Sequence, residues 1–251
     1  MRPMARPSTT DAPPRGLPQG LPQGDDKVRA VRGMFDAIAP RYDLVNRIMT
    51  FRMDVGWRRL AVRSLTLRPR STVLDVACGT GDLCRELAAT GLDPVGVDLS
   101  FGMLAAARTD ASLLQGDALR LPLRDAAVDG VTCGFALRNL VELEPFFGEL
   151  ARVLRPGGRI ALLEVATPPN RLMRWGHGIY FGRVVPVIGG LISDASAYRY
   201  LPRSVAYLPE PDVMRRMIAN AGFVDVDRRL LSGGVAQLIC ATRATGRSDA
   251  A

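Results

Sequence analysis

Residues 73–100 combine two carboxylates with a glycine-rich turn, at a spacing suited to binding a nucleoside. A short apolar run containing Asp75 leads into Gly79-Thr80-Gly81, and a second apolar run ends at Asp98, 17 residues after Gly81. Glycines let backbone N–H groups approach a ligand closely, and the helix predicted after the turn directs its positive end at the same place. An acid near this spacing accepts hydrogen bonds from ribose hydroxyls in such units. The stretch therefore predicts a β–α–β nucleoside-binding unit.

Two residues of this unit indicate which nucleoside it binds. Cys84 occupies the position of the third glycine in the dinucleotide fingerprint, so the close packing around a pyrophosphate is not fully supported. The Asp75 carboxylate would repel a diphosphate but would suit a cationic ligand. Both features favour S-adenosylmethionine over a dinucleotide.

Asp117 lies where another short strand, with Leu113 and Leu114, is predicted to end. Ligands of open α/β sheets bind at the carboxyl ends of the strands. Asp117 is therefore a candidate acceptor for the amino group of an adenine, and a solvated turn aspartate is the alternative.

Arg138 and Asn139 follow the strand predicted over residues 130–133 and place a guanidinium and an amide at the same edge. A fixed positive charge beside a sulfonium is unfavourable unless an anion lies between them. Arg138 thus indicates an anionic substrate or transition state. The alternative is an arginine at a helix start that pairs with Glu142 or Glu144.

Three helical segments must position these groups from the N-terminal side. Residues 28–38, 42–49 and 53–65 repeat apolar side chains at helical steps, and they precede the first strand. They therefore fall outside the strand–helix alternation, and we expect residues 27–68 to form a helical cap over the site. Within this cap, Tyr42, Asn46 and Trp57 either pack against neighbouring helices or face the ligand.

The alternation of strands and helices continues to the C-terminus with one interruption, at about residues 168–211. This insertion carries Trp175, Tyr180 and an apolar run up to Ile192, which predicts an apolar lid over a hydrophobic substrate. A packed pair of peripheral helices is the alternative. His177, the only histidine, is expected to be a surface or packing residue rather than a catalytic base.

Composition sets the remaining limits. The chain has 251 residues, 47% of them apolar, a net charge of +8 and four cysteines without metal-ligand spacing, which is typical of a globular protein in a reducing cytosol. We expect a disordered tail over residues 1–26, which repeat GLPQGLPQG and lack a signal peptide, and a flexible end over residues 246–251. No uninterrupted apolar run reaches the ~18 residues of a membrane span.

Several longer motifs are more specific than the glycine turn. They are MFDAIAPRYDLVNRIMTF followed by WRR, VLDVACGTGD, GVDLSFGML, GDALRLPL, GFALRN, ARVLRPGGR with LLEVATP, and AYRYLPRSV. Over roughly residues 31–241 the chain resembles the ubiquinone/menaquinone-biosynthesis C-methyltransferases, and among these it is most similar to the demethylmenaquinone methyltransferases. The resemblance implies methylation of a reduced quinone ring, demethylmenaquinol to menaquinol, with S-adenosylmethionine as the cofactor.

The resemblance also implies a fold and a set of site residues. The fold is α/β: a class I methyltransferase with a Rossmann-like seven-stranded sheet over residues 69–245, mostly parallel with an antiparallel last strand. The residues implied to hold or shape the cofactor site are Asp75, Gly79, Thr80, Gly81, Asp98, Leu99, Met103, Asp117, Ala118 and Gly134. Arg138 and Asn139 are expected to stabilise the ionised quinol, with Tyr42 or Asp117 as the base; no metal is expected.

One departure from the family pattern keeps other functions open. The family often has serine where this chain has Gly134, and Ala136 replaces a usual glycine, so another phenolic or secondary-metabolite substrate is an alternative. A basic nucleic-acid-binding protein is a weaker alternative because the arginines are scattered, and a non-catalytic scaffold is a third. The expected partners are a lipophilic quinol, an anionic membrane surface contacted peripherally from the cytoplasm and a second copy of the chain, without nucleic acid.

Overall fold

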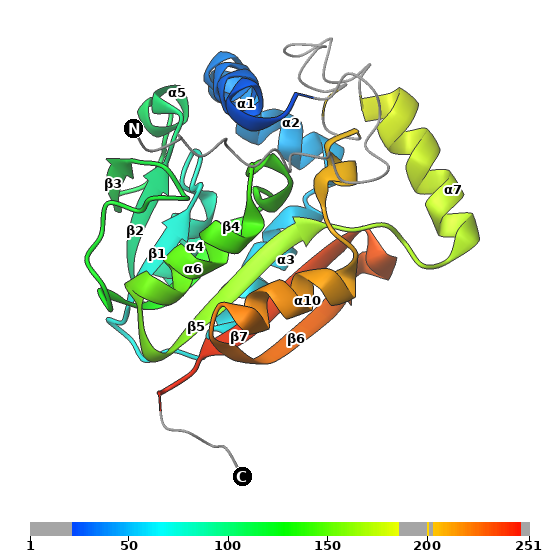
Figure 1. The fold of residues 1–251 in the computed structure, drawn as a ribbon. Helices are drawn as coiled ribbons and strands as arrows, with labels where there is room; N and C mark the ends of the chain where they lie inside the picture. The colour runs from blue at the N-terminus through cyan, green and yellow to red at the C-terminus, as the bar shows by residue number, and fades with distance from the viewer. Residues whose placement is uncertain (1–21, 186–199, 201–202, 247–251) are drawn as a thin grey trace, which may run out of the picture.

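A seven-stranded sheet forms the centre of the structure, a computed structural model that describes residues 22–185, 200 and 203–246 (Figure 1). The strand order is β3-β2-β1-β4-β5-β7-β6. The first five strands pair in parallel, and β7 runs antiparallel to both β5 and β6. The predicted α/β sheet, mostly parallel with an antiparallel last strand, is confirmed. The strands are β1 Thr72–Val76, β2 Asp93–Asp98, β3 Ser112–Gln115, β4 Val128–Gly134, β5 Leu154–Val165, β6 Phe223–Leu231 and β7 Ala236–Arg243.

Helices cover both faces of the sheet, because apolar side chains of β1 point to both faces and must be buried on each. Leu74 packs in the larger core with α6 (Leu143–Val153) and α10 (Pro211–Asn220), whereas Val73 packs on the opposite face. The second face is covered by α3 (Met53–Ser64) and α4 (Asp82–Ala89). Successive side chains of a strand point to opposite faces, so a strand buried on both sides is apolar along its length.

The helical cap is smaller than the sequence predicts. It consists of α1 (Gly24–Ile38), the 3₁₀ turn η1 (Ala39–Arg41) and α2 (Tyr42–Met49), and α1 contacts α5 (Phe101–Ala105). The first helix begins at Gly24, earlier than residue 27. The third segment, α3, differs from expectation because its apolar face, with Ala61 and Leu65, packs against Val73 and Leu238 in the sheet core.

The insertion after β5 is described in part. It contains α7 (Arg171–Ile179), the π-helical turn η3 (Tyr180–Val184) and the 3₁₀ turn η4 (Val205–Tyr207). The rest of the predicted lid, at residues 186–199 and 201–202, lies outside the described residues, as do residues 1–21 of the expected tail and 247–251 of the expected flexible end. No helix in the described ranges is long and apolar enough to cross a membrane.

β5 and β6 are the longest strands. The antiparallel pairing of β6 with β7 continues to the partners Leu231 and Ala236. β5 begins at Leu154, which pairs with Val128. The short 3₁₀ turns η2 (Leu137–Asn139) and η5 (Ser232–Gly234) complete the described elements.

Candidate active site

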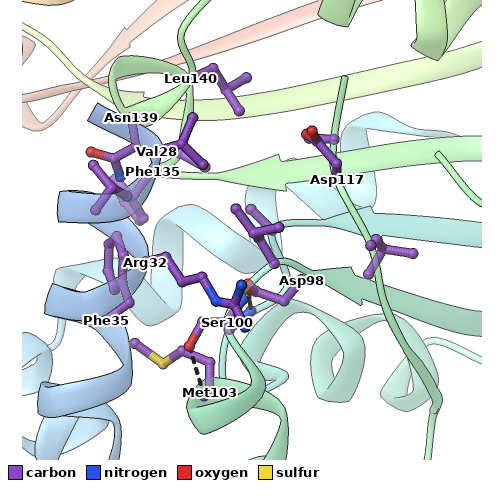
Figure 2. A pocket seen from close by; sticks show the side chains of 18 of the residues that line it. Val28, Arg32, Phe35, Asp98, Ser100, Met103, Asp117, Phe135, Asn139 and Leu140 are labelled. Atoms are coloured by element: carbon purple, nitrogen blue, oxygen red, sulfur yellow. Dashed lines mark hydrogen bonds between the residues drawn. The ribbon is translucent and has the colours of Figure 1, made fainter. Parts of the chain in front are cut away.

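A cavity lies between α1 and the carboxyl ends of β1, β2 and β4 (Figure 2). Its empty volume, open mouth included, is about 910 Å³. The residues predicted from the sequence that line it are Tyr42, Gly79, Asp98, Leu99, Met103, Asp117, Ala118, Gly134 and Asn139. We call it the first cavity.

Asp98 is held in place by backbone groups. Its Oδ2 accepts the N–H of Gly79 at 2.8 Å, and its Oδ1 accepts the N–H of Ser100 at 2.8 Å. A carboxylate has about four lone-pair sites, so acceptor capacity remains for a ligand. Burial raises the pKa of Asp98 despite these hydrogen bonds. Gly79 has a φ of +55°, and a Cβ placed there would meet nothing within 4 Å, so the backbone is open to the cavity at this point.

Helix α1 forms the opposite wall, which the sequence predicted only as a cap. Val28, Arg32 and Phe35 point from α1 into the cavity (Figure 2). Asp36 fixes this helix to α5, because its Oδ1 accepts hydrogen bonds from Ser100 Oγ at 2.5 Å and from the N–H of Gly102 at 2.9 Å. The apolar periodicity of α1 was the available signal for these residues, but it did not show which of them face a ligand.

Three residues predicted to hold or shape the cofactor site are not among those that line the first cavity. Asp75 is buried and accepts hydrogen bonds from Thr132 Oγ1 at 2.8 Å and Cys84 Sγ at 3.6 Å, and burial raises its pKa to about 7. Thr80 donates to Asp43 of α2 at 2.5 Å. Gly81, at a φ of +82°, precedes α4, where a Cβ would lie 2.6 Å from a Thr109 methyl. Asp75 and Gly81 were expected to shape the site rather than to contact the ligand, and the predicted role of Thr80 in holding the cofactor stays a prediction.

A second, larger cavity adjoins the first. Its empty volume is about 1760 Å³ with the open mouth included, and its lining is mostly apolar. Both cavities are lined by Phe35, Tyr42 and Phe135, which form their shared wall. The second cavity is further lined by α2, the start of α3, the end of β5 and α7, through residues such as Met49, Phe51, Trp57, Val165, Met173 and Tyr180.

The turn η2 directs neighbouring side chains to different cavities. Arg138 lines the second cavity and Asn139 the first, with Tyr42 at the wall between them. The hydroxyl of Tyr200 lies 3.4 Å from Asn139 Oδ1. The sequence correctly predicted that both η2 residues lie at the sheet edge, and it did not predict this division.

Arg138 is paired with a residue that the sequence did not suggest. Its Nη1 forms a buried ion pair with Glu164 of β5 and donates to the Phe135 carbonyl at 2.7 Å, so Glu142 and Glu144 are not its partners. Glu164 is fully buried and neutralises the guanidinium. In the part of the chain that the structure describes, Arg138 Nε is buried without a hydrogen-bond partner. Such a donor is costly unless a ligand or water accepts from it.

Burial and cavity lining indicate what the other candidate residues can do. Burial raises the pKa of Tyr42, so its phenol keeps its proton at neutral pH and is a donor rather than a base. His177, which was expected to be a surface or packing residue, is partly buried and lines the second cavity, and burial lowers its pKa. Asp117 is exposed and lines only the first cavity. At Gly134, a Cβ would lie 2.9 Å from Leu83 Cδ1, so Leu83 occupies the space that a serine side chain would need.

The sheet order, the glycine turn after β1 and the acid that ends β2 define the fold of an S-adenosylmethionine-dependent methyltransferase. Among solved structures, phosphoethanolamine N-methyltransferase 2 of Haemonchus contortus in complex with S-adenosyl-L-methionine is similar, with a TM-score of 0.55 and 15% identity over 74% of this chain and 52% of that one. At this identity the likeness concerns the fold alone.

The chain belongs to the ubiE/COQ5 methyltransferase family, whose model matches residues 23–243. It is 46% identical to the demethylmenaquinone methyltransferase of Thermus thermophilus, over 82% of this chain and 97% of that protein. It is 42% identical to the ubiquinone/menaquinone biosynthesis C-methyltransferase UbiE of Syntrophotalea carbinolica, over 84% and 93%. The family resemblance predicted from the sequence is confirmed, and with it the assignment as a methyltransferase that uses S-adenosylmethionine.

Proposed function

We propose that this methyltransferase acts on a ring carbon of a reduced quinone, converting demethylmenaquinol to menaquinol. The observation that carries the proposal is the meeting of two cavities at Phe35, Tyr42 and Phe135. One cavity has the polar groups that a nucleoside needs, and the other is larger and mostly apolar, as a quinol ring with a hydrophobic tail requires. The relatives named for reactions of this kind support the same substrate class.

The first cavity fits the cofactor. Asp98 retains acceptor capacity for ribose hydroxyls, Asp117 is available to an adenine amino group, and Met103 with Ala118 supplies apolar contacts for the ring. Gly79 permits close approach of the backbone. Bound there, S-adenosylmethionine would supply an electrophilic methyl group, which the quinol carbon takes up with loss of its own ring proton.

The polar groups near the shared wall are suited to the acceptor. A phenolic hydroxyl has a pKa near ~10, and its ring carbon is a good nucleophile only when the hydroxyl is ionised. Arg138 and Tyr42 line the second cavity and both carry hydrogen-bond donors, so we assign them to the quinol oxygen. Since Glu164 neutralises Arg138, this stabilisation comes from directed hydrogen bonds more than from net charge. Asn139 faces the first cavity and orients the groups there.

The proton acceptor is best sought in the second cavity. Asp117 lines only the first cavity, and Tyr42 is protonated at neutral pH. His177 lines the second cavity, and its lowered pKa leaves the imidazole neutral and able to accept a proton, directly or through water. We therefore favour His177 over both earlier candidates as the base.

Methyl transfer to a chemically reduced, short-tailed demethylmenaquinol tests the proposal. We expect a mass gain of one CH₂ unit on the quinol that depends on S-adenosylmethionine, and a rate that falls at low pH as His177 becomes protonated. His177→Asn should remove that acidic limb. A panel of soluble phenols serves as the comparison, because the substitution at Gly134 leaves another phenolic acceptor as the second candidate. A preference for the soluble phenols would overturn the quinol assignment.

A further inference from the structure

Large apolar side chains are concentrated around the mouth of the second cavity. Of the eleven exposed large hydrophobic residues in the described part of the chain, seven lie in two short segments. Phe51, at 71% exposure, belongs to the turn between α2 and α3, and Leu172 and Trp175, at 75% and 68%, belong to α7. We call this set the mouth surface; its members are Leu44, Ile48, Phe51, Met53, Leu172, Met173 and Trp175.

The two segments meet although they are more than a hundred residues apart in the chain. The rings of Phe51 and Tyr180 lie 5.6 Å apart between centroids, and the Tyr180 hydroxyl donates to the Met49 carbonyl at 2.9 Å. Phe51, Met53 and Met173 line the second cavity as well as being exposed. The mouth surface is therefore continuous with the interior that we assign to the quinol.

Helix α7 turns two sets of residues in different directions. Met173 and His177 of α7, with Tyr180 of η3, line the second cavity. Leu172, Trp175 and Ile179 recur at three- and four-residue steps and form a second stripe. None of the nine residues of α7 is buried. A helix with aromatic and aliphatic residues on one side and arginines beside them is typical of a segment that lies in a membrane interface.

The exposed charges of the same segments are all positive. Exposed arginines stand beside the apolar residues at positions 47, 52, 171, 174 and 183. The flanking carboxylates do not offset them at the surface, since Asp43 is buried against Thr80 and Asp54 is buried in an ion pair with Arg58. Residues 44–53 and 165–185 contain no other acid. Arginines interleaved with exposed apolar groups match an anionic lipid surface in both charge and polarity.

We propose that the mouth surface docks on an anionic lipid membrane, so that the opening of the second cavity faces the bilayer from which a quinol is drawn. This inference rests on the proposed lipophilic substrate for its purpose, but docking itself requires neither quinol nor cofactor. Apolar side chains enter the boundary between headgroups and acyl chains, while the arginines contact lipid phosphates.

Vesicle binding by the full chain tests docking directly. With vesicles of phosphatidylglycerol and phosphatidylcholine we expect co-sedimentation that weakens as salt rises or as phosphatidylglycerol is removed. Trp57 is buried and Trp175 exposed, so the Trp57→Phe background reports Trp175 alone, and its emission should shift to the blue on binding. Absence of binding to anionic vesicles, or binding without an emission shift, would overturn the proposal.

Matched variants separate the mouth surface from general hydrophobicity. Leu172→Glu with Trp175→Glu should weaken binding at least about tenfold, because two apolar contacts are replaced by charges that the membrane repels. Val224→Glu with Leu230→Glu, on the exposed side of β6, is the control and should bind as the wild type does. Equal vesicle binding by the two variants would contradict docking through this surface. So would a result in which the α7 substitutions leave vesicle binding unchanged and instead abolish a concentration-dependent dimer of the chain.

Activity assays then distinguish the two proposals. The α7 variant should retain methyl transfer to a short-tailed quinol in solution and lose it for a long-tailed quinol embedded in vesicles. If the wild type binds vesicles but methylates neither quinol, the quinol assignment fails and the docking surface stands. If the wild type methylates the soluble quinol, and the α7 variant methylates the embedded quinol as fast as the wild type does, docking by this surface fails and the proposed function stands.

Discussion

The two cavities are built in different ways. The first is formed at the ends of neighbouring strands, where Asp98 is held by the N–H groups of Gly79 and Ser100. The second is formed by segments distant in the chain and joined by side chains, as in the pair Arg138–Glu164 and the hydrogen bond from Trp57 to Ser232 at 2.9 Å. A contact made by backbone groups depends little on which residues surround it, whereas a side-chain pair exists only if both residue types are present. We therefore expect substitutions of side chains to change the second cavity more than the strand-end part of the first.

Breaking the buried pair beneath the second cavity is expected to have the largest effect. Arg138→Met leaves Glu164 as an uncompensated buried charge, which should lower the free energy of unfolding by about 3–5 kcal/mol. The double variant Arg138→Met with Glu164→Leu should recover most of that loss but not methyl transfer. Urea unfolding followed by circular dichroism measures the first effect, and single-turnover assays measure the second. A single variant as stable as the wild type would show that the second cavity does not depend on this pair.

Asp98→Asn tests the first cavity, with the next largest effect. Replacing a charged acceptor of ribose hydroxyls should weaken S-adenosylmethionine binding by about 100-fold, since each hydrogen bond to a charged group contributes ~1.5–3 kcal/mol. Both Asp98 oxygens accept backbone N–H groups, and the amide nitrogen of an asparagine cannot accept, so the free energy of unfolding should fall by about 1–3 kcal/mol although burial disfavours the charge of Asp98 and raises its pKa. Calorimetric titration gives the affinity, and the exposed Asp110→Asn is the control. An unchanged affinity would remove Asp98 from the cofactor site.

The contrast between the cavities also explains what the sequence could predict. The strand ends, the glycine turn and Asp98 lie within one stretch of chain, so local patterns located them. Glu164 was visible only as an acid inside an apolar strand, and its pairing with Arg138 depends on how β5 and η2 meet. Thr80 was predicted to hold the cofactor from its place in the motif, but the sequence did not show that its hydroxyl donates to Asp43 on α2. Side-chain pairs across long separations carry no periodic signal, which is why these assignments needed the structure.

Tyr42→Phe examines the wall that the two cavities share, and the expected effect is smaller. The substitution keeps the edge-to-face contact with Phe35, whose ring centroid lies 5.9 Å away, and removes only the hydroxyl. We expect kcat to fall about 10- to 100-fold through loss of one donor to the quinol oxygen, with cofactor affinity unchanged. Tyr207→Phe, which removes a hydroxyl that donates to the Pro22 carbonyl and lines neither cavity, is the matched control and should change kcat little. Weaker cofactor binding with normal kcat would assign Tyr42 to the first cavity instead.

Lys27 links the two regions, and its titration gives the smallest predicted effect. This only lysine of the chain is buried in α1, where Nζ donates to the Leu140 carbonyl at 2.6 Å and lies 3.5 Å from the ring centroid of Tyr207. Leu140 lines the first cavity, and Tyr207 belongs to η4, whose Val205 lines the second. Lys27 therefore holds α1 against both.

Burial lowers the pKa of Lys27 from 10.5 to about 8. The unfolded chain thus binds more protons than the fold above pH 8, so this group makes the protein more stable as pH rises through that range. Between pH 7 and 9 the wild type should gain about 1 kcal/mol relative to Lys27→Met, measured by urea unfolding of both proteins at each pH. The opposite sign would mean that the contacts with Leu140 and Tyr207 favour the ammonium more than burial disfavours it. The contacts of Lys27 with Leu140 and Tyr207 would then be strongest when Lys27 is charged, and the packing of α1 against both cavities would weaken at alkaline pH.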